Sequence, residues 1–178
     1  MIYVFLADGF EECEAIAPID ILRRGGIEVK TVGIGKSQIT GSHSITVNCD
    51  LTENEIDLKK IDGIILPGGM PGTLNLDGSD TVQRVLKYTY ENGLLIGAIC
   101  AAPLILGRKG YLKGKKATCF TGFENELIGA NVINSPVVCD GNIITAYGAG
   151  AAFEFGFALL NTIKGEEFTK NLRKQMRY

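Results

Sequence analysis

The sequence predicts an α/β fold: a mostly parallel central sheet with helices packed on both of its faces. Two observations predict it. Short runs rich in isoleucine, leucine and valine alternate with segments of helical periodicity along the chain. Most of these runs are apolar at every position, which is typical of strands buried on both faces of a parallel sheet. Ligands of such sheets bind at the carboxyl ends of the strands, so the loops after residues 7, 66 and 99 are expected to converge.

The elements are expected in the following order. Residues 2–7 form a buried strand, followed by a helix that ends at Gly25 and Gly26. Pro18 lacks the N–H that would bond the Glu14 carbonyl, so this helix is expected to kink or restart there. A strand at 27–34 and a hairpin at 38–48 come next. Later strands are predicted at 61–66, 94–99, 137–138 and 142–146, and later helices at 80–91, 101–107, 151–163 and 166–177.

The bulk composition is that of an ordinary globular protein. The 178 residues fit one domain, residues 1–178, with 46% hydrophobic and 21% charged residues and a net charge of -2. No basic stripe is present, so nucleic acid is not an expected partner. The longest apolar run, residues 94–107, is shorter than the roughly 20 residues of a membrane span. Because no basic leader precedes the first strand either, we expect a cytoplasmic protein without membrane contact.

The cysteine and histidine content argues against disulfides and metal. The five cysteines are odd in number and widely spaced, which does not suit a disulfide framework. The chain has no CxxC pair, and His43 is its only histidine, so no standard zinc pattern can be assembled. The segments 33–37 and 148–153 each lack a glycine that a phosphate or dinucleotide loop needs. We expect neither a metal nor a cofactor.

Cys100 is the strongest candidate for chemistry. It directly follows the strand at 94–99 and precedes a helix, the arrangement in which a nucleophile elbow presents one side chain at the top of a sheet. Small residues flank it, as a crowded turn requires, and amides at a helix N-terminus favour a thiolate. The alternative is a buried, inert cysteine at the end of a strand.

Two glycines end the preceding strand and would lie beside that cysteine. Gly68 and Gly69 let the backbone approach a ligand closely. The amide of Gly69, together with that of Ala101, would then form an oxyanion hole next to the sulfur. The alternative is a plain turn at the exit of a strand.

Glu14 is the candidate acid. Apolar residues lie on its helical face, so burial would raise the pKa of its carboxyl and let it share a proton with the thiol. The alternative is a surface glutamate. The nearby Asp8, Glu11 and Glu12 are expected to be solvated charges at a helix start.

Several segments together resemble the ThiJ/PfpI superfamily, and within it the branch of the parkinsonism-associated protein DJ-one and bacterial YajL. They are LADGFEECE at 6–14, LPGG at 66–69 and AICAAP at 98–103, followed by ATC at 117–119 and GAGAAFEF at 148–155. The resemblance covers nearly the whole chain. It implies a flavodoxin-like three-layer α/β sandwich, usually assembled as a homodimer.

The resemblance also implies roles for single residues. Cys100 would be the nucleophile and Glu14 its acid partner. The amides of Gly69 and Ala101 would be the oxyanion donors. Pocket-lining positions fall at Gly68, at Cys119, where relatives carry histidine or cysteine, and at His43, where relatives carry an arginine near the pocket or dimer contact. Protease-like members carry a histidine directly after the cysteine, and Ala101 stands there in this chain, which disfavours a peptidase.

Two functions are expected on this basis. The resemblance implies a cofactor-free glyoxalase or deglycase, whose substrate is a small aldehyde such as methylglyoxal or an early glycation adduct. The Cys100 thiolate would attack it and Glu14 would move the proton. The alternative is a redox-sensing, oxidative-stress or chaperone protein in which peroxide oxidises Cys100 to the sulfinate.

Overall fold

The computed structural model describes residues 1–178 as eleven strands, six α-helices and four short 3-10 helices. The strands are β1 (Ile2–Leu6), β2 (Val29–Gly33), β3 (Gln38–Thr40), β4 (Thr46–Asn48), β5 (Leu51–Thr52), β6 (Gly63–Leu66), β7 (Leu95–Ile99), β8 (Lys116–Ala117), β9 (Asn131–Val132), β10 (Val137–Asp140) and β11 (Ile143–Ala146). The α-helices are α1 (Glu12–Arg24), α2 (Gly72–Asp77), α3 (Asp80–Glu91), α4 (Pro103–Arg108), α5 (Ala152–Lys164) and α6 (Glu166–Gln175). None of the helices has the length and apolar content that crossing a membrane requires.

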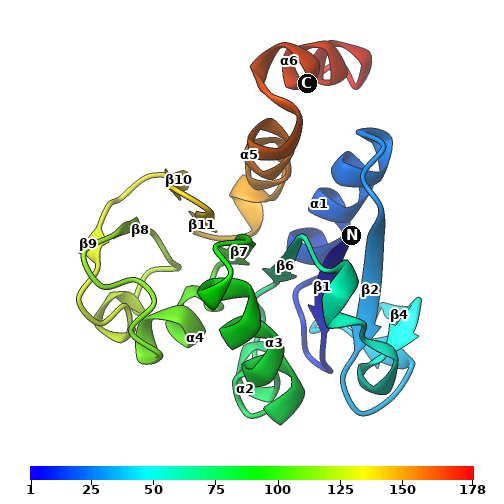
Figure 1. The fold of residues 1–178 in the computed structure, drawn as a ribbon, viewed down its shortest axis with the longest axis vertical. Helices are drawn as coiled ribbons and strands as arrows, with labels where there is room; N and C mark the ends of the chain where they lie inside the picture. The colour runs from blue at the N-terminus through cyan, green and yellow to red at the C-terminus, as the bar shows by residue number, and fades with distance from the viewer.

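Seven of the strands form the central sheet, in the order β10-β11-β7-β6-β1-β2-β5. Every neighbouring pair is parallel except β10 and β11, which form an antiparallel hairpin at one edge. In Figure 1, α2, α3 and α4 gather on one side of the molecule, and α5 and α6 lie on the other. The predicted α/β class with a mostly parallel sheet is confirmed.

The alternation of side chains along β1 explains why the molecule has two cores. Ile2, Val4 and Leu6 pack into one core with residues of α1, α5 and α6, whereas Tyr3 and Phe5 pack into the other with residues of α2, α3 and α4. Successive side chains of a strand point to opposite faces of a sheet. A strand covered on both faces is therefore apolar at every position, as β1 is.

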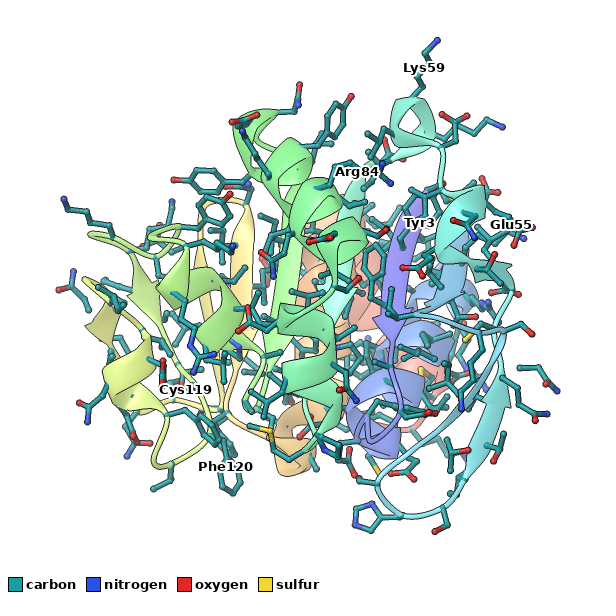
Figure 2. The ribbon with its side chains drawn as sticks, turned by 90° about the horizontal axis from the view of Figure 1, so that it is seen from below. Tyr3, Glu55, Lys59, Arg84, Cys119 and Phe120 are labelled. Carbon is teal, nitrogen blue, oxygen red and sulfur yellow. The ribbon has the colours of Figure 1, made fainter.

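The carboxyl ends of β1, β6 and β7 lie side by side at one end of the sheet, because β6 lies between the other two strands and is parallel to both. The chain passes from β1 to β2 on one side and returns to β6 on the other. β1 and β6 thus mark the switch point at which α/β sheets bind ligands. Figure 2 shows Cys119 and Phe120 at this end of the sheet, and Lys59, which precedes β6, at the opposite end.

The structure excludes a restart of the first helix and adds four short elements. α1 continues through Pro18 without a restart. The helix α5 packs closely against it there, and a Cβ added to Gly156 would lie 3.0 Å from Pro18 Cα. This packing compensates for the backbone hydrogen bond that proline removes. The sequence does not predict α2, β5, β8 or β9, because none of them exceeds six residues and so none shows a period.

Candidate active site

Cys100 lies in the turn after β7, in a backbone conformation that side chains rarely adopt. Its φ is +65°, and such strain persists only where the surroundings impose it. Its N–H donates to the carbonyl of Ala146 at 2.8 Å, and its carbonyl accepts from the N–H of Phe120 at 2.8 Å. The partly exposed side chain packs against both cores. The chain therefore presents this thiol at the end of the sheet, as a nucleophile elbow does.

Glu14 is brought to Cys100 by the first turn of α1. The Glu11 side chain caps this helix by accepting the Glu14 N–H at 2.7 Å. The Glu14 side chain is buried, with 1% of its surface exposed. Its Oε2 accepts the N–H of Gly68 at 2.9 Å, and its carboxyl is hydrogen-bonded to the Cys100 thiol. A carboxyl and a thiol thus share one hydrogen bond in an apolar setting.

The two glycines after β6 make this approach possible. A Cβ at Gly68 would lie 2.5 Å from Glu14 Oε2 and 2.6 Å from Cys100 Cβ. Gly69 has φ +90°, and a Cβ there would lie 2.5 Å from the backbone nitrogen of Glu11. No larger residue fits at either position without displacing backbone or the acid-thiol pair.

Gly68→Ala is expected to separate Glu14 from Cys100 and to destabilise the fold by about 1–3 kcal/mol, the usual cost of overpacking. The added methyl group meets the Glu14 carboxylate, the Cys100 Cβ and, at 2.9 Å, the backbone oxygen of Ile99, so the acid or the turn must move. Urea unfolding measures the stability, and alkylation by iodoacetamide measures the reactivity of Cys100. Gly78→Ala is the matched control, because its Cβ would meet only the Leu74 carbonyl, at 3.4 Å. Equal stability and reactivity of the two variants would contradict the assigned contact.

The acid and the thiol shift each other's pKa. Burial raises the pKa of Glu14 to about 7, against hydrogen bonds from Cys100 and Gly68 that lower it. Burial, and then the charge and hydrogen bond of Glu14, raise the pKa of the Cys100 thiol to about 12. The pair therefore gives up one proton near neutrality and holds the second, so that it carries a single negative charge just above pH 7.

Two backbone amides favour the thiolate form of this pair. The N–H groups of Gly69 and Ala101 bond the Cys100 sulfur and lower the pKa of its thiol. The turn therefore contributes the expected amides, although α4 itself begins only at Pro103. These amides do not outweigh burial and the charge of Glu14, which together keep the thiol pKa raised. When Glu14 is protonated, its charge and its hydrogen bond no longer raise the pKa of the Cys100 thiol. The two amides then remain to stabilise a negative charge on the sulfur.

Glu12 is buried, so the expectation of a solvated charge there is wrong. The hairpin of β3 and β4 covers it: Glu12 accepts the N–H groups of His43 at 2.8 Å and Ile45 at 3.4 Å. Its Oε2 also lies 2.9 Å from His43 Nδ1, and this contact raises the pKa of the exposed imidazole. Glu11, Glu12 and His43 hold three ligand-type atoms within 4.8 Å. Because the Glu12 oxygens already accept these donors, we assign the cluster a role in fastening the hairpin to α1.

Cys119 is buried and lines a cavity of about 680 Å³ beside the turn of Cys100. Burial, with the charge of Glu124, raises the pKa of its thiol to about 11. Gly68 and His43 line none of the five cavities.

Sequence reasoning missed Ala146 and Phe120, which hold the Cys100 peptide, because their role depends on strand pairing that carries no local signal.

Comparison with known proteins identifies relatives across the chain. It is 34% identical over 148 residues to the deglycase TK1284 of Thermococcus kodakarensis, covering 82% of this chain and 88% of that one. It is 32% identical over 168 residues to the glutathione-independent glyoxalase DJR-1.2 of Caenorhabditis elegans, covering 93% and 89%. The chain spans 40% of the length of protein DJ-1 homolog B of Arabidopsis thaliana, to which it is 37% identical over 175 residues.

Structural comparison and a family model agree with these relatives. The structure of oxidized Toxoplasma gondii DJ-1 matches with a TM-score of 0.95 and 31% identity, covering 99% of this chain and 97% of that one. The model of the DJ-1/PfpI family matches residues 1–162. The resemblance inferred from the segments around Glu14, Gly68 and Cys100 is thereby confirmed, and the chain belongs to the DJ-1/PfpI family.

Proposed function

We propose that this protein is a cofactor-free glyoxalase and deglycase that uses Cys100 as its nucleophile and Glu14 as its acid-base group. The observation that carries the proposal is the buried Glu14 carboxyl, hydrogen-bonded to a thiol at a strained elbow that also receives two amides. Relatives named as a deglycase and as a glutathione-independent glyoxalase support the same reaction class. Peptidase activity is disfavoured, because Ala101 stands where a histidine would be needed.

The proposed reaction on methylglyoxal uses four groups of the chain. The Cys100 sulfur forms a bond to the aldehyde carbon, and the oxygen takes up a proton to give a hemithioacetal. Glu14 removes the proton from that carbon and returns it to the neighbouring ketone carbon, which leaves a lactoyl thioester on Cys100. The amides of Gly69 and Ala101 stabilise negative charge on oxygen during these steps. Water then cleaves the thioester, releasing lactate and the free thiol.

On a glycation adduct the first step is a displacement. The Cys100 sulfur forms a bond to the former aldehyde carbon, and the bond from that carbon to the carrier amine or thiol breaks. The carrier leaves with the thiol proton. The remaining steps are the same. One site thus accounts for both activities named among the relatives.

The test is lactate formation from methylglyoxal without glutathione. Purified wild-type protein should produce lactate, with the Cys100→Ala variant as the blank. Chiral analysis of the product excludes the uncatalysed reaction, which gives a racemate. Wild-type turnover no faster than that of Cys100→Ala would refute the proposal.

A second candidate is a redox sensor, which we propose because Cys100 is partly exposed and its Glu14 partner can donate to an oxidised sulfur. Mild hydrogen peroxide is expected to add two oxygen atoms to Cys100 before any other cysteine is modified. Cys13 and Cys139 are more exposed but lack these donors, so they are the internal controls. Peptide mass spectrometry measures the order of oxidation. Earlier oxidation of Cys13 or Cys139 would show that exposure, rather than the site, governs reactivity.

We also propose that the chain forms a homodimer, as DJ-1 family proteins commonly do. The surface that fits a second copy contains Cys13 and three exposed apolar side chains, Ile16, Ile45 and Phe153, around one groove on α1. Clustered apolar groups of this kind mark interaction sites.

Ile45→Glu is expected to convert the dimer to monomer, because it places a charge in this groove. Ile128→Glu is the matched control, since both isoleucines are 58% exposed and Ile128 lies outside the groove. Sedimentation velocity measures the change. A wild-type monomer, or a dimer that survives Ile45→Glu, would exclude this surface.

Two further proposals concern organisation and location. Residues 1–178 form one domain, which is supported by the packing of α1 from the start of the chain on α5 near its end. The protein resides in the cytoplasm, which is supported by five cysteines that are all free, as is usual in a reducing compartment.

A further inference from the structure

The cavity of about 680 Å³ lies beside Cys100 but does not include it. Two chain segments connect the cavity to the nucleophile. Phe120 lines the cavity, and its N–H donates to the Cys100 carbonyl at 2.8 Å. Tyr147 also lines it and directly follows Ala146, whose carbonyl accepts the Cys100 N–H at 2.8 Å. Both wall segments are thus joined to the Cys100 backbone, which places the cavity next to the turn that carries the thiol.

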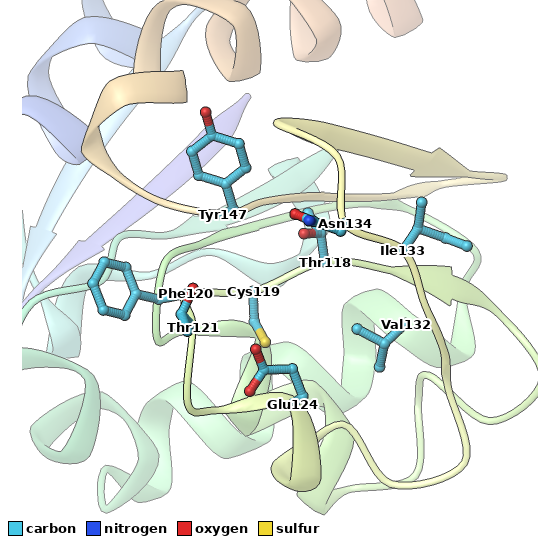
Figure 3. A pocket seen from close by; sticks show the side chains of 9 residues that line it. All are labelled: Thr118, Cys119, Phe120, Thr121, Glu124, Val132, Ile133, Asn134 and Tyr147. Carbon is cyan, nitrogen blue, oxygen red and sulfur yellow. The ribbon is translucent and has the colours of Figure 1, made fainter.

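The cavity wall has the chemistry of a cation site. Glu124 is its only charged side chain, and no lysine or arginine lines it. The Glu124 carboxylate accepts one hydrogen bond within the protein, from the N–H of Gly122 at 2.8 Å. Figure 3 shows this carboxylate beside the Cys119 sulfur, with Phe120 and Tyr147 on the adjoining wall.

Two aromatic rings add to the attraction for a cation. The side chains of Phe120 and Tyr147 are 49% and 38% exposed, so their rings are open to a ligand. Aromatic faces attract ammonium and guanidinium groups, quaternary ammonium included. Apolar contact with the alkyl part of such a group is available from Val132 and Ile133 on the opposite wall.

We infer that this cavity is a subsite for the carrier portion of a glycation adduct, and that Glu124 selects carriers bearing a positive charge. The preferred substrates are then aldehyde adducts whose leaving group is a cationic alkyl chain, rather than free methylglyoxal, which carries no such group. The reaction itself rests on the proposed function; the cation selectivity rests on Glu124 and the two rings. Glu124 is a specificity residue and takes no part in the bond-making steps.

Hemithioacetals of methylglyoxal test the selectivity for cationic carriers. The carrier thiol can be varied while the carbon that Cys100 attacks stays the same. The three carriers are thiocholine, mercaptoethanol and mercaptoacetate, which are cationic, neutral and anionic. At equal concentrations of free methylglyoxal, kcat/KM for lactate formation should be about fivefold higher for the cationic adduct than for the neutral one, and lowest for the anionic one. Glu124→Gln should bring the kcat/KM values of the cationic and neutral adducts within about twofold of each other. Equal selectivity in wild type and Glu124→Gln would overturn the inference.

A binding experiment separates this inference from the proposed function. The Cys100→Ala protein is titrated by calorimetry with choline and with its neutral isostere 3,3-dimethylbutan-1-ol. Choline should bind more tightly, and Glu124→Gln in the same background should weaken choline about fivefold. Glu167→Gln is the control, because it removes one exposed negative charge on α6, outside the cavity. Choline binding without lactate from any adduct would refute the proposed reaction and support the subsite; choline binding no tighter than its isostere would refute the subsite.

Discussion

Cys100→Ala is expected to lower kcat for lactate formation from methylglyoxal by at least about 10³-fold, because the covalent intermediate cannot form. The residual rate should equal that of the solution reaction. The fold should persist, since alanine keeps the Cβ and the backbone hydrogen bonds to Ala146 and Phe120. Steady-state kinetics measures the loss, and circular dichroism checks the fold.

The control for this change is Cys139→Ala. Cys139 is an exposed thiol on the edge strand β10 and has no acid partner, so its removal should leave kcat within about twofold of wild type. A Cys100→Ala variant that retains most of its activity would place the nucleophile elsewhere. A Cys139→Ala variant that loses activity as well would show a structural effect common to both substitutions.

Glu14→Gln is expected to lower kcat by about 10²–10⁴-fold, the usual contribution of a general acid-base group. Glutamine keeps the shape of the side chain and can still accept the Gly68 N–H, but it cannot carry the proton between carbons. Wild-type activity should rise through pH 7 as the acid-thiol pair acquires its single charge. This limb near pH 7 should be absent from the variant. A kcat-pH profile of both proteins measures it, and an unchanged limb would assign the titration to another group.

The same substitution is expected to stabilise the fold above pH 7. The pKa of Glu14 is about 7 in the folded chain and ordinary in the unfolded chain. Between pH about 4.5 and 7 the folded chain holds a proton that the unfolded chain has released, so the free energy of unfolding falls as pH rises through this window. Above it the buried charge costs about 3 kcal/mol. Urea melts at pH 5.5 and 8 should show about 2 kcal/mol of this loss in wild type and little of it in Glu14→Gln.

Some of the site could be predicted because the signal is local. Cys100 follows a buried strand and stands among small residues, and a tight turn into a helix needs both. Glu14 lies on the apolar face of an amphipathic helix, which places it in the interior whatever the partner. Gly68 and Gly69 follow the neighbouring strand, and parallel strands bring their carboxyl ends together.

Other parts of the site could not be predicted because they depend on segments that meet only in the fold. Glu12 is buried because the hairpin of β3 and β4 covers it, and its sequence position is that of any solvated glutamate at a helix start. The pKa of the Cys100 thiol depends on burial and on the contact with Glu14 as well as on the turn amides, so the sequence alone does not give it. Pro18 is tolerated in α1 because Gly156 lets α5 approach closely.

The sequence by itself determined the parallel α/β fold and the family, and it predicted that Cys100 and Glu14 would lie together, because periodicity and the residues at strand ends are properties of short segments. Only the tertiary structure decided the strain at Cys100, the shared proton with Glu14 and the acidic, aromatic cavity beside the thiol. The physical reason is that a pKa, a backbone strain and a cavity each arise from groups distant in the chain that packing forces together. Glu124 and Tyr147 face one space only after β8, β9 and β11 have been folded around it.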